Sequence, residues 1–171
     1  HPHVAVMDGG MRRWLQLGLP TTTDPVPLRP AGDFAARPTP GAHVDADTTA
    51  AAALDPQRRV LDARAAERYR GEVEPIDPVA GHVPGALNHP SSGIVTADGC
   101  FLPPAALANA FTRTLGPVAP ADAITMCGSG VTACHLLLAM EHAGLPGARL
   151  YPGSWSEWSR GPARPVARGK G

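Results

Sequence analysis

The stretch CGSGVTAC, residues 127–134, follows directly on the apolar run DAITM. A short apolar strand that ends in Cys127 and passes through a glycine-rich loop into a helix is typical of a parallel α/β sheet. Gly128 and Gly130 permit the tight turn that such a loop requires. Because successive N–H groups in this turn converge, an anion at its head is stabilised. The pattern therefore predicts a reactive thiolate at Cys127.

Strands and helices alternate outward from this loop. Residues 58–63 (RRVLDA) predict a buried strand, and residues 103–115 predict a helix that starts with proline. The cysteine loop lies between a strand over 123–126 and an apolar helix over 132–143, and ARLY (148–151) is expected to be a further strand. We therefore expect an α/β fold, a parallel β-sheet with helices on both faces.

Composition excludes several classes of protein. Fifteen basic residues balance fifteen acidic ones, so the net charge indicates neither nucleic-acid nor membrane binding. No apolar run approaches the length of a membrane span, and the first residues lack the zones of a signal peptide. The three cysteines match neither a disulfide framework nor a zinc pattern. Free thiols in a cytoplasmic protein without a metal are the expectation.

A cysteine phosphatase is disfavoured by the residues after Cys127. Such an enzyme has an arginine six positions beyond its nucleophile to grip phosphate, and position 133 is alanine here. Cys134 is expected to be a core residue of the helix. An isolated cysteine is more often a buried core residue than a nucleophile, so the glycines and hydroxyls of the loop carry the catalytic hypothesis.

Four motifs, DARAAERYRG, GHVPGA, CGSGVTAC and GSWSEW, occur in this order. Together they resemble the catalytic C-terminal domain of tandem rhodaneses, the 3-mercaptopyruvate and thiosulfate sulfurtransferase family. The resemblance implies the rhodanese fold, a cysteine that carries a transferable persulfide, and no metal or organic cofactor. The nucleophile would be Cys127, and its persulfide-binding and substrate-binding loop would comprise Gly128, Ser129, Gly130, Val131 and Thr132.

The same resemblance suggests the domain organisation. MDGGMRRW resembles the end of the inactive N-terminal rhodanese domain, so residues 1–20 are expected to be the C-terminal remnant of an upstream domain in a longer gene product. The Pro- and Thr-rich residues 21–43 predict an extended interdomain linker. Residues 44–161 would be the catalytic domain. Residues 162–171, with no large apolar side chain beyond one valine, predict a flexible basic tail.

The resemblance also implies a clamp for the donor. In the family an arginine binds the donor's carboxylate or sulfonate, and the sequence ERY brings Arg68 to that position. A neutral loop with Ser129 is similar to that of the mercaptopyruvate enzymes. Those enzymes usually have a second arginine nine residues after the first, where this chain has Asp77. The choice between 3-mercaptopyruvate and thiosulfate therefore stays open. His82 is expected to stabilise a turn rather than to act as a base.

The predicted activity is transfer of a sulfur atom from 3-mercaptopyruvate or thiosulfate, through a Cys127 persulfide, to cyanide or a thiol such as thioredoxin. The expected partners are this small donor, the thiol acceptor and the upstream rhodanese domain of the same protein, with no nucleic acid and no membrane. The alternative is a rhodanese-like binding or regulatory module without turnover. An intact cysteine within a complete loop argues against that alternative.

Overall fold

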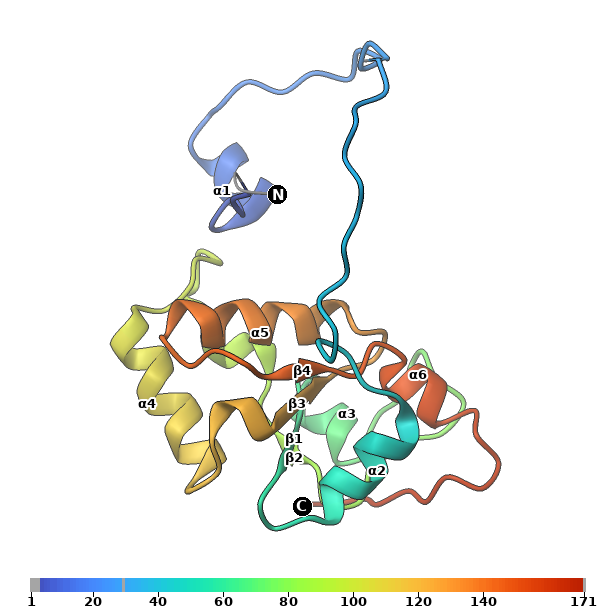
Figure 1. Cartoon of the computed structure of the whole chain (residues 1–171). Helices are drawn as coiled ribbons and strands as arrows, with labels where there is room; N and C mark the ends of the chain where they lie inside the picture. The colour runs from blue at the N-terminus through green and yellow to red at the C-terminus, as the bar shows by residue number, and fades with distance from the viewer. Residues whose placement is uncertain (1–3, 29, 171) are drawn as a thin grey trace.

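The computed structural model of the chain describes residues 4–28 and 30–170. Its centre is a sheet of four parallel strands in the order β2-β1-β3-β4 (Figure 1). In the central pair, Val60 lies opposite Ile124 and Asp62 lies opposite Met126. The predicted parallel α/β fold is confirmed. The strands are β1 (Arg59–Asp62), β2 (Leu87–Asn88), β3 (Ala123–Met126) and β4 (Arg149–Leu150).

Helices cover both faces of this sheet (Figure 1). One face packs against α4 (Pro104–Leu115) and α5 (Val131–His142), and the other against α2 (Ala46–Leu54) and α6 (Ser154–Trp158). None of the helices in the described part of the chain is long and apolar enough to cross a bilayer. The remaining helical elements are α1 (Gly10–Gln16), α3 (Ala66–Tyr69), and the 3-10 turns η1 (Ser91–Ile94) and η2 (Pro120–Asp122).

The alternation of side chains along the strands builds two apolar cores. Leu61 packs with Phe111 and Leu136 on the α4–α5 face. Val60 points the other way and packs with Trp155 and the residues around it on the α2–α6 face. Successive strand residues point to opposite faces, so one four-residue strand contributes to both cores. The cysteine loop at the end of β3 is therefore supported from two sides.

Strand β2 was missed in the sequence because it lies inside the long proline-containing segment before η1. It has only two residues, and its pairing partners are Leu61 and Asp62 of β1. Helix α2 is capped by Asp45, whose Oδ1 accepts the N–H of Thr48 at 2.8 Å. A two-residue strand has too little periodicity to be recognised without its neighbour.

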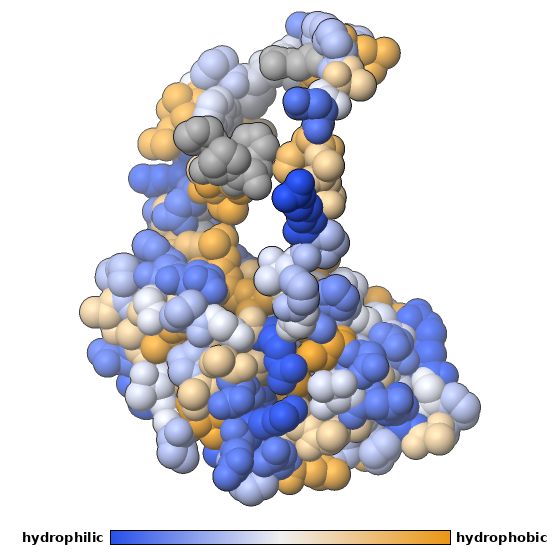
Figure 2. Space-filling model, in the orientation of Figure 1, coloured by the Kyte–Doolittle hydropathy of each residue, from blue (hydrophilic) through white to orange (hydrophobic). Residues whose placement is uncertain are grey.

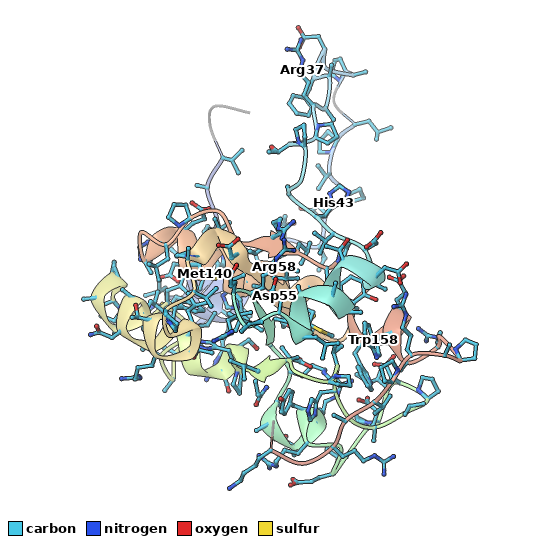
Figure 3. All side chains as sticks on the ribbon, turned by 60° about the horizontal axis from the view of Figure 1, so that its bottom comes forward. Arg37, His43, Asp55, Arg58, Met140 and Trp158 are labelled. Atoms are coloured by element: carbon cyan, nitrogen blue, oxygen red, sulfur yellow. The ribbon has the colours of Figure 1, made fainter. Side chains whose placement is uncertain are left out.

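The segment that precedes the α/β body forms an arch above it (Figures 1 and 2). Residues 30–39 form no helix or strand and are exposed, and Figure 3 shows Arg37 on this stretch and His43 where the segment joins the body. The N-terminal end of the arch contacts the body beside Phe101. The N–H of Phe101 donates to Asp8 Oδ1 at 2.9 Å. Residues 1–3 of the expected upstream remnant, residue 29 of the linker and residue 171 of the tail lie outside the described residues.

Residues 162–170 differ from the flexible tail expected from the sequence. His82 and Ala167 exchange two backbone hydrogen bonds of 2.9 Å, which forms an antiparallel bridge. The indole Nε1 of Trp158 donates to the carbonyl of Pro165 at 2.9 Å. The sequence indicated flexibility because the segment lacks core-forming side chains. Its partners are instead main-chain groups of the GHVPGA segment, which only the folded domain brings within reach.

His82 is buried beneath this bridge, with 1% of its surface exposed. Its Nδ1 lies 2.8 Å from the carbonyl oxygen of Tyr69, and its ring stacks on the Tyr69 ring with centroids 3.8 Å apart. His82 therefore packs in the interior against α3, with its ring nitrogen next to a backbone carbonyl. Burial lowers the pKa of His82 and also that of His89, which stacks on Phe111.

Because the pKa values of His82 and His89 are lowered, we expect the domain to lose stability in mild acid. Below a pH of about 6.5 the unfolded chain takes up protons that the folded chain, with lowered histidine pKa values, does not. The free energy of unfolding should therefore fall as the pH drops from 7 to 5, by up to about 1.4 kcal/mol per pH unit for each proton. Urea denaturation across this range measures the slope.

The variant His82→Gln should reduce that slope while lowering stability at pH 7. His43→Gln, at an exposed histidine of the segment leading into the body, is the matched control and should leave the slope unchanged. An identical slope in the His82→Gln variant would contradict this assignment.

Candidate active site

Cys127 lies directly after β3 and lines a cavity of about 330 Å³ at the carboxyl ends of the central strands. This is the edge at which parallel sheets usually hold their ligands. The thiol-bearing residue is 2% exposed. The lining comes from residues 63–65 after β1, from Arg68 on α3, from residues 76–77, and from residues 127–129 with Val131 and Thr132. Ser91 and Ser156 complete it.

The backbone of the cysteine is held by α6. The N–H of Cys127 donates to Ser154 Oγ at 3.0 Å, and its carbonyl accepts the N–H of Trp155 at 3.0 Å. The next carbonyl, of Gly128, accepts the N–H of Ser156 at 2.8 Å. Ser154 has a φ of 52°, a left-handed conformation uncommon for a residue with a side chain. We infer that this conformation is maintained by the hydroxyl, which donates in turn to the Tyr151 carbonyl at 2.9 Å.

The loop turns at Gly130, whose φ is 84°. A Cβ at this position would lie 2.7 Å from the carbonyl oxygen of Pro152, so only glycine fits. Helix α5 begins at the next residue and leaves its first N–H groups without intrahelical acceptors. Four of the five predicted loop residues, Gly128, Ser129, Val131 and Thr132, line the cavity, and Gly130 shapes the turn behind them.

Arg68 reaches the loop from the facing helix α3. A Cβ placed on Gly128 would lie 3.6 Å from Arg68 Nη1, so the guanidinium stands over the loop backbone. The Arg68 side chain is 17% exposed, and its Nη2 donates to Glu74 Oε1 at 2.6 Å. Asp77 Oδ2 lies 3.4 Å from the same nitrogen. Arg68 therefore lines the same cavity as Cys127, and its Nη2 is already bound to carboxylates.

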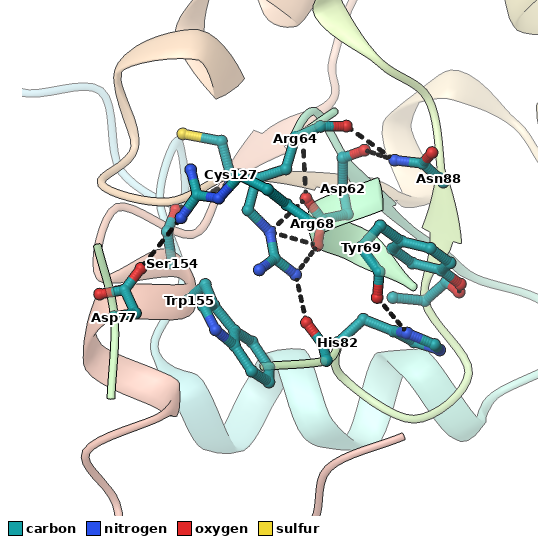
Figure 4. Close-up of polar contacts among 12 residues, drawn as sticks. Asp62, Arg64, Arg68, Tyr69, Asp77, His82, Asn88, Cys127, Ser154 and Trp155 are labelled. Carbon is teal, nitrogen blue, oxygen red and sulfur yellow. Dashed lines mark hydrogen bonds and ion pairs between the residues drawn. The ribbon is translucent and has the colours of Figure 1, made fainter. Parts of the chain in front are cut away.

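A second arginine, Arg64, lies next to Arg68 in the wall of the cavity (Figure 4). Arg64 is buried, with Nη2 2.6 Å from Asp62 Oδ2 and 2.8 Å from the carbonyl of Gly81. Its guanidinium lies 4.6 Å from the ring centroid of Trp155. Glu74 Oε2, 3.4 Å from Arg64 Nη1, joins the two arginines.

Burial alone would raise the pKa of Glu74, but hydrogen bonds from Arg68 and from the N–H groups of Asp77 and Ile76 hold it below its ordinary value. The carboxylate therefore stays charged at neutral pH. In the described residues, no group of three or more His, Cys, Asp or Glu side chains is placed to hold a metal ion.

Sequence analysis missed three contributors to the site and misplaced one cysteine. Glu74 belongs to none of the four motifs, whereas Ser154 and Ser156 lie in GSWSEW, which supported the family resemblance but was not assigned to the site. Cys134, expected in the core, is exposed on α5. The prediction was wrong because α5 buries only one side, through residues such as Ala133 and Leu136, although eight of its 12 residues are apolar.

The Ser154 hydroxyl should therefore be needed to hold the cysteine loop. Ser154→Ala removes both hydrogen bonds and keeps the unfavourable backbone angle, so we expect a loss of about 1–3 kcal/mol in the free energy of unfolding. Ser154→Gly also loses the hydroxyl but tolerates the angle, and should lose less. Denaturant unfolding of the two variants tests this order; equal stability of Ser154→Ala and the parent would contradict it.

Comparison with known proteins agrees with this geometry. A protein of Pseudomonas aeruginosa named probable 3-mercaptopyruvate sulfurtransferase is 48% identical over 166 residues, which are 97% of this chain and 58% of that protein. The thiosulfate sulfurtransferase of Rattus norvegicus is 34% identical over 99% of this chain and 58% of its own length. The chain thus spans less than two thirds of the length of these relatives.

The fold is shared with a solved structure of the anaerobic ergothioneine biosynthesis enzyme of Chlorobium limicola, with a TM-score of 0.82 at 23% identity. That match covers 95% of this chain and 41% of the other. A family model, described as the rhodanese-like domain, matches residues 46–161 and so takes in the whole cysteine site. The chain belongs to the rhodanese-like domain family.

Proposed function

We propose that this domain transfers a sulfur atom from 3-mercaptopyruvate or thiosulfate, through a Cys127 persulfide, to cyanide or to a thiol acceptor such as thioredoxin. The observation that carries the proposal is the convergence of three features on one cavity: the Cys127 side chain, the N-terminus of α5 and the Arg68 guanidinium. The names of the relatives, which include both kinds of sulfurtransferase, support the same activity.

In the first step the Cys127 thiolate attacks the terminal sulfur of thiosulfate or the thiol sulfur of 3-mercaptopyruvate. With thiosulfate the sulfur–sulfur bond breaks and sulfite leaves; with 3-mercaptopyruvate the carbon–sulfur bond breaks and the enolate of pyruvate leaves, taking up a proton. The hydroxyls of Ser129 and Thr132, which line the cavity, are suited to orient that leaving group. Cys127 retains the sulfur as a persulfide.

In the second step the acceptor attacks the outer sulfur of the persulfide, and the Cys127 thiolate is regenerated. The persulfide anion would be stabilised by the first N–H groups of α5, which are preorganised by the turn at Gly130. Two successive displacements on one nucleophile give ping-pong kinetics.

The surroundings of the domain are also part of the proposal. We infer that residues 1–20 belong to an upstream rhodanese domain of the same protein, whose residues would help to close the cavity. A cytoplasmic location fits the three cysteines, all of them free. The catalytic cycle itself calls for no metal and no organic cofactor, because the sulfur is carried by the cysteine.

Loading of Cys127 is the central test. Intact mass should increase by one sulfur atom after exposure to 3-mercaptopyruvate or thiosulfate, and cyanide should remove the gain. Cys127→Ser should abolish loading without lowering the melting temperature. The matched controls Cys134→Ser and Cys100→Ser, at the other two free thiols, should load normally. A full gain of sulfur in Cys127→Ser would exclude the proposed nucleophile, and no gain in the parent would favour a binding module without turnover.

Arg68 should contribute to donor binding. Arg68→Ala removes a charged hydrogen-bond donor worth about 1.5–3 kcal/mol, so the donor KM should rise about tenfold or more while saturating donor still forms the persulfide. Arg113→Ala, at an exposed arginine on α4, is the control and should leave KM unchanged. An unchanged KM in Arg68→Ala would confine Arg68 to its ion pairs with Glu74 and Asp77.

A further inference from the structure

Asp77 is the unexplained group of the cavity. It lines the same space as Cys127, and its side chain is fully buried. Its Oδ2 lies 3.4 Å from Arg68 Nη2, while Oδ1 has no hydrogen-bond partner in the described residues. A buried carboxylate oxygen without a partner is costly. Because Asp77 is a lining residue of the cavity, a ligand with a hydrogen-bond-donating cation would supply the partner that this oxygen lacks.

The charges around Asp77 support the same conclusion. Two guanidiniums, of Arg64 and Arg68, face three carboxylates, of Asp62, Glu74 and Asp77. Asp62 binds Arg64 at 2.6 Å and Glu74 binds Arg68 at 2.6 Å, so both arginines have a close partner without Asp77. Asp77 therefore gives the cavity wall one excess negative charge. This charge would repel a donor that carries only negative charge.

We propose that the preferred sulfur donor is an α-amino-acid persulfide, whose carboxylate binds Arg68 and whose ammonium group binds Asp77 Oδ1. This inference rests on the proposed sulfurtransferase function and names its donor class. Figure 4 shows the Arg68 guanidinium between the Asp77 carboxylate and the Cys127 side chain. Arg68 Nη1 has no protein partner in the described part of the chain and is therefore available to the donor.

An α-amino acid fits this arrangement because its carboxylate and its ammonium group are attached to the same carbon. The site offers an adjacent cation and anion, with Arg68 Nη2 and Asp77 Oδ2 3.4 Å apart. Thiosulfate and 3-mercaptopyruvate bring only negative charge to this wall, and neither satisfies Asp77 Oδ1. They should therefore be poorer donors than a zwitterion of similar size.

The chemistry balances without an oxidant or a reductant. The Cys127 thiolate attacks the terminal sulfur of the persulfide R–S–SH, and a bond forms between these two sulfurs. The S–S bond of the donor breaks, and the electron pair leaves with R–S⁻, the thiolate of the amino acid. Cys127 is left as Cys–S–SH, which the acceptor then unloads as above.

Cysteine persulfide and the persulfide of 3-mercaptopropionate, which differs only by lacking the ammonium group, provide the matched pair of probes. The rate of sulfur loading on Cys127, followed by intact mass, should give a kcat/KM at least tenfold higher for cysteine persulfide. Asp77→Asn keeps the shape and removes the charge, and should reduce this ratio about tenfold or more by slowing the amino-acid donor alone. Asp122→Asn, before β3 at the opposite end of the strand from Cys127, should keep the ratio.

The comparison of the two probes on the unmodified protein needs no variant, so it holds even where Asp77→Asn fails to fold. Equal loading from both persulfides would overturn the inference and leave the sulfurtransferase proposal standing. An Asp77→Asn protein that loses both donors equally would also overturn it. Failure of every donor, including thiosulfate and 3-mercaptopyruvate, to load Cys127 would overturn the proposed function and this inference with it.

Discussion

The buried pair of Asp62 and Arg64 is the interaction on which the site depends. Both side chains are essentially inaccessible, and besides each other they bind the carbonyl of Gly81 and the carboxylate of Glu74. The Arg64 guanidinium also lies over the ring of Trp155. Loss of one partner would leave a buried charge uncompensated, at a cost of about 3–5 kcal/mol. The end of β1, the loop through Gly81 and helix α6 are thus joined at one point.

This junction explains how the fold positions a reactive thiol. The pair anchors Trp155, the backbone of Trp155 holds the carbonyl of Cys127, and the neighbouring Ser154 holds the N–H of Cys127. The cysteine peptide is therefore fastened on both sides before the loop enters α5. A nucleophile held in this way keeps its orientation to the helix N-terminus with little reorganisation during the reaction.

The wall opposite the thiol combines charges of both signs. Its cation, Arg68, is accompanied by two carboxylates, and Asp77, whose buried Oδ1 has no hydrogen-bond partner in the described residues, is one of the lining residues. Under the proposed function, the rigid thiol loop would carry the sulfur and the wall of mixed charge, from Glu74 to Asp77, would select the donor.

The order of the motifs, the parallel α/β fold, the candidate nucleophile and the family could all be predicted from the chain alone, because apolar periodicity and the CGSGVT loop are local features. The resemblance to the family also pointed to Arg68 and Asp77. Folding set the contacts that no motif specifies: the pairing of Arg68 with Glu74, the Ser154 contact to Cys127, the exposure of Cys134 and the docking of the tail beside His82. These contacts join residues that are distant in the chain or depend on helix orientation, and no local pattern specifies a partner that arrives through folding.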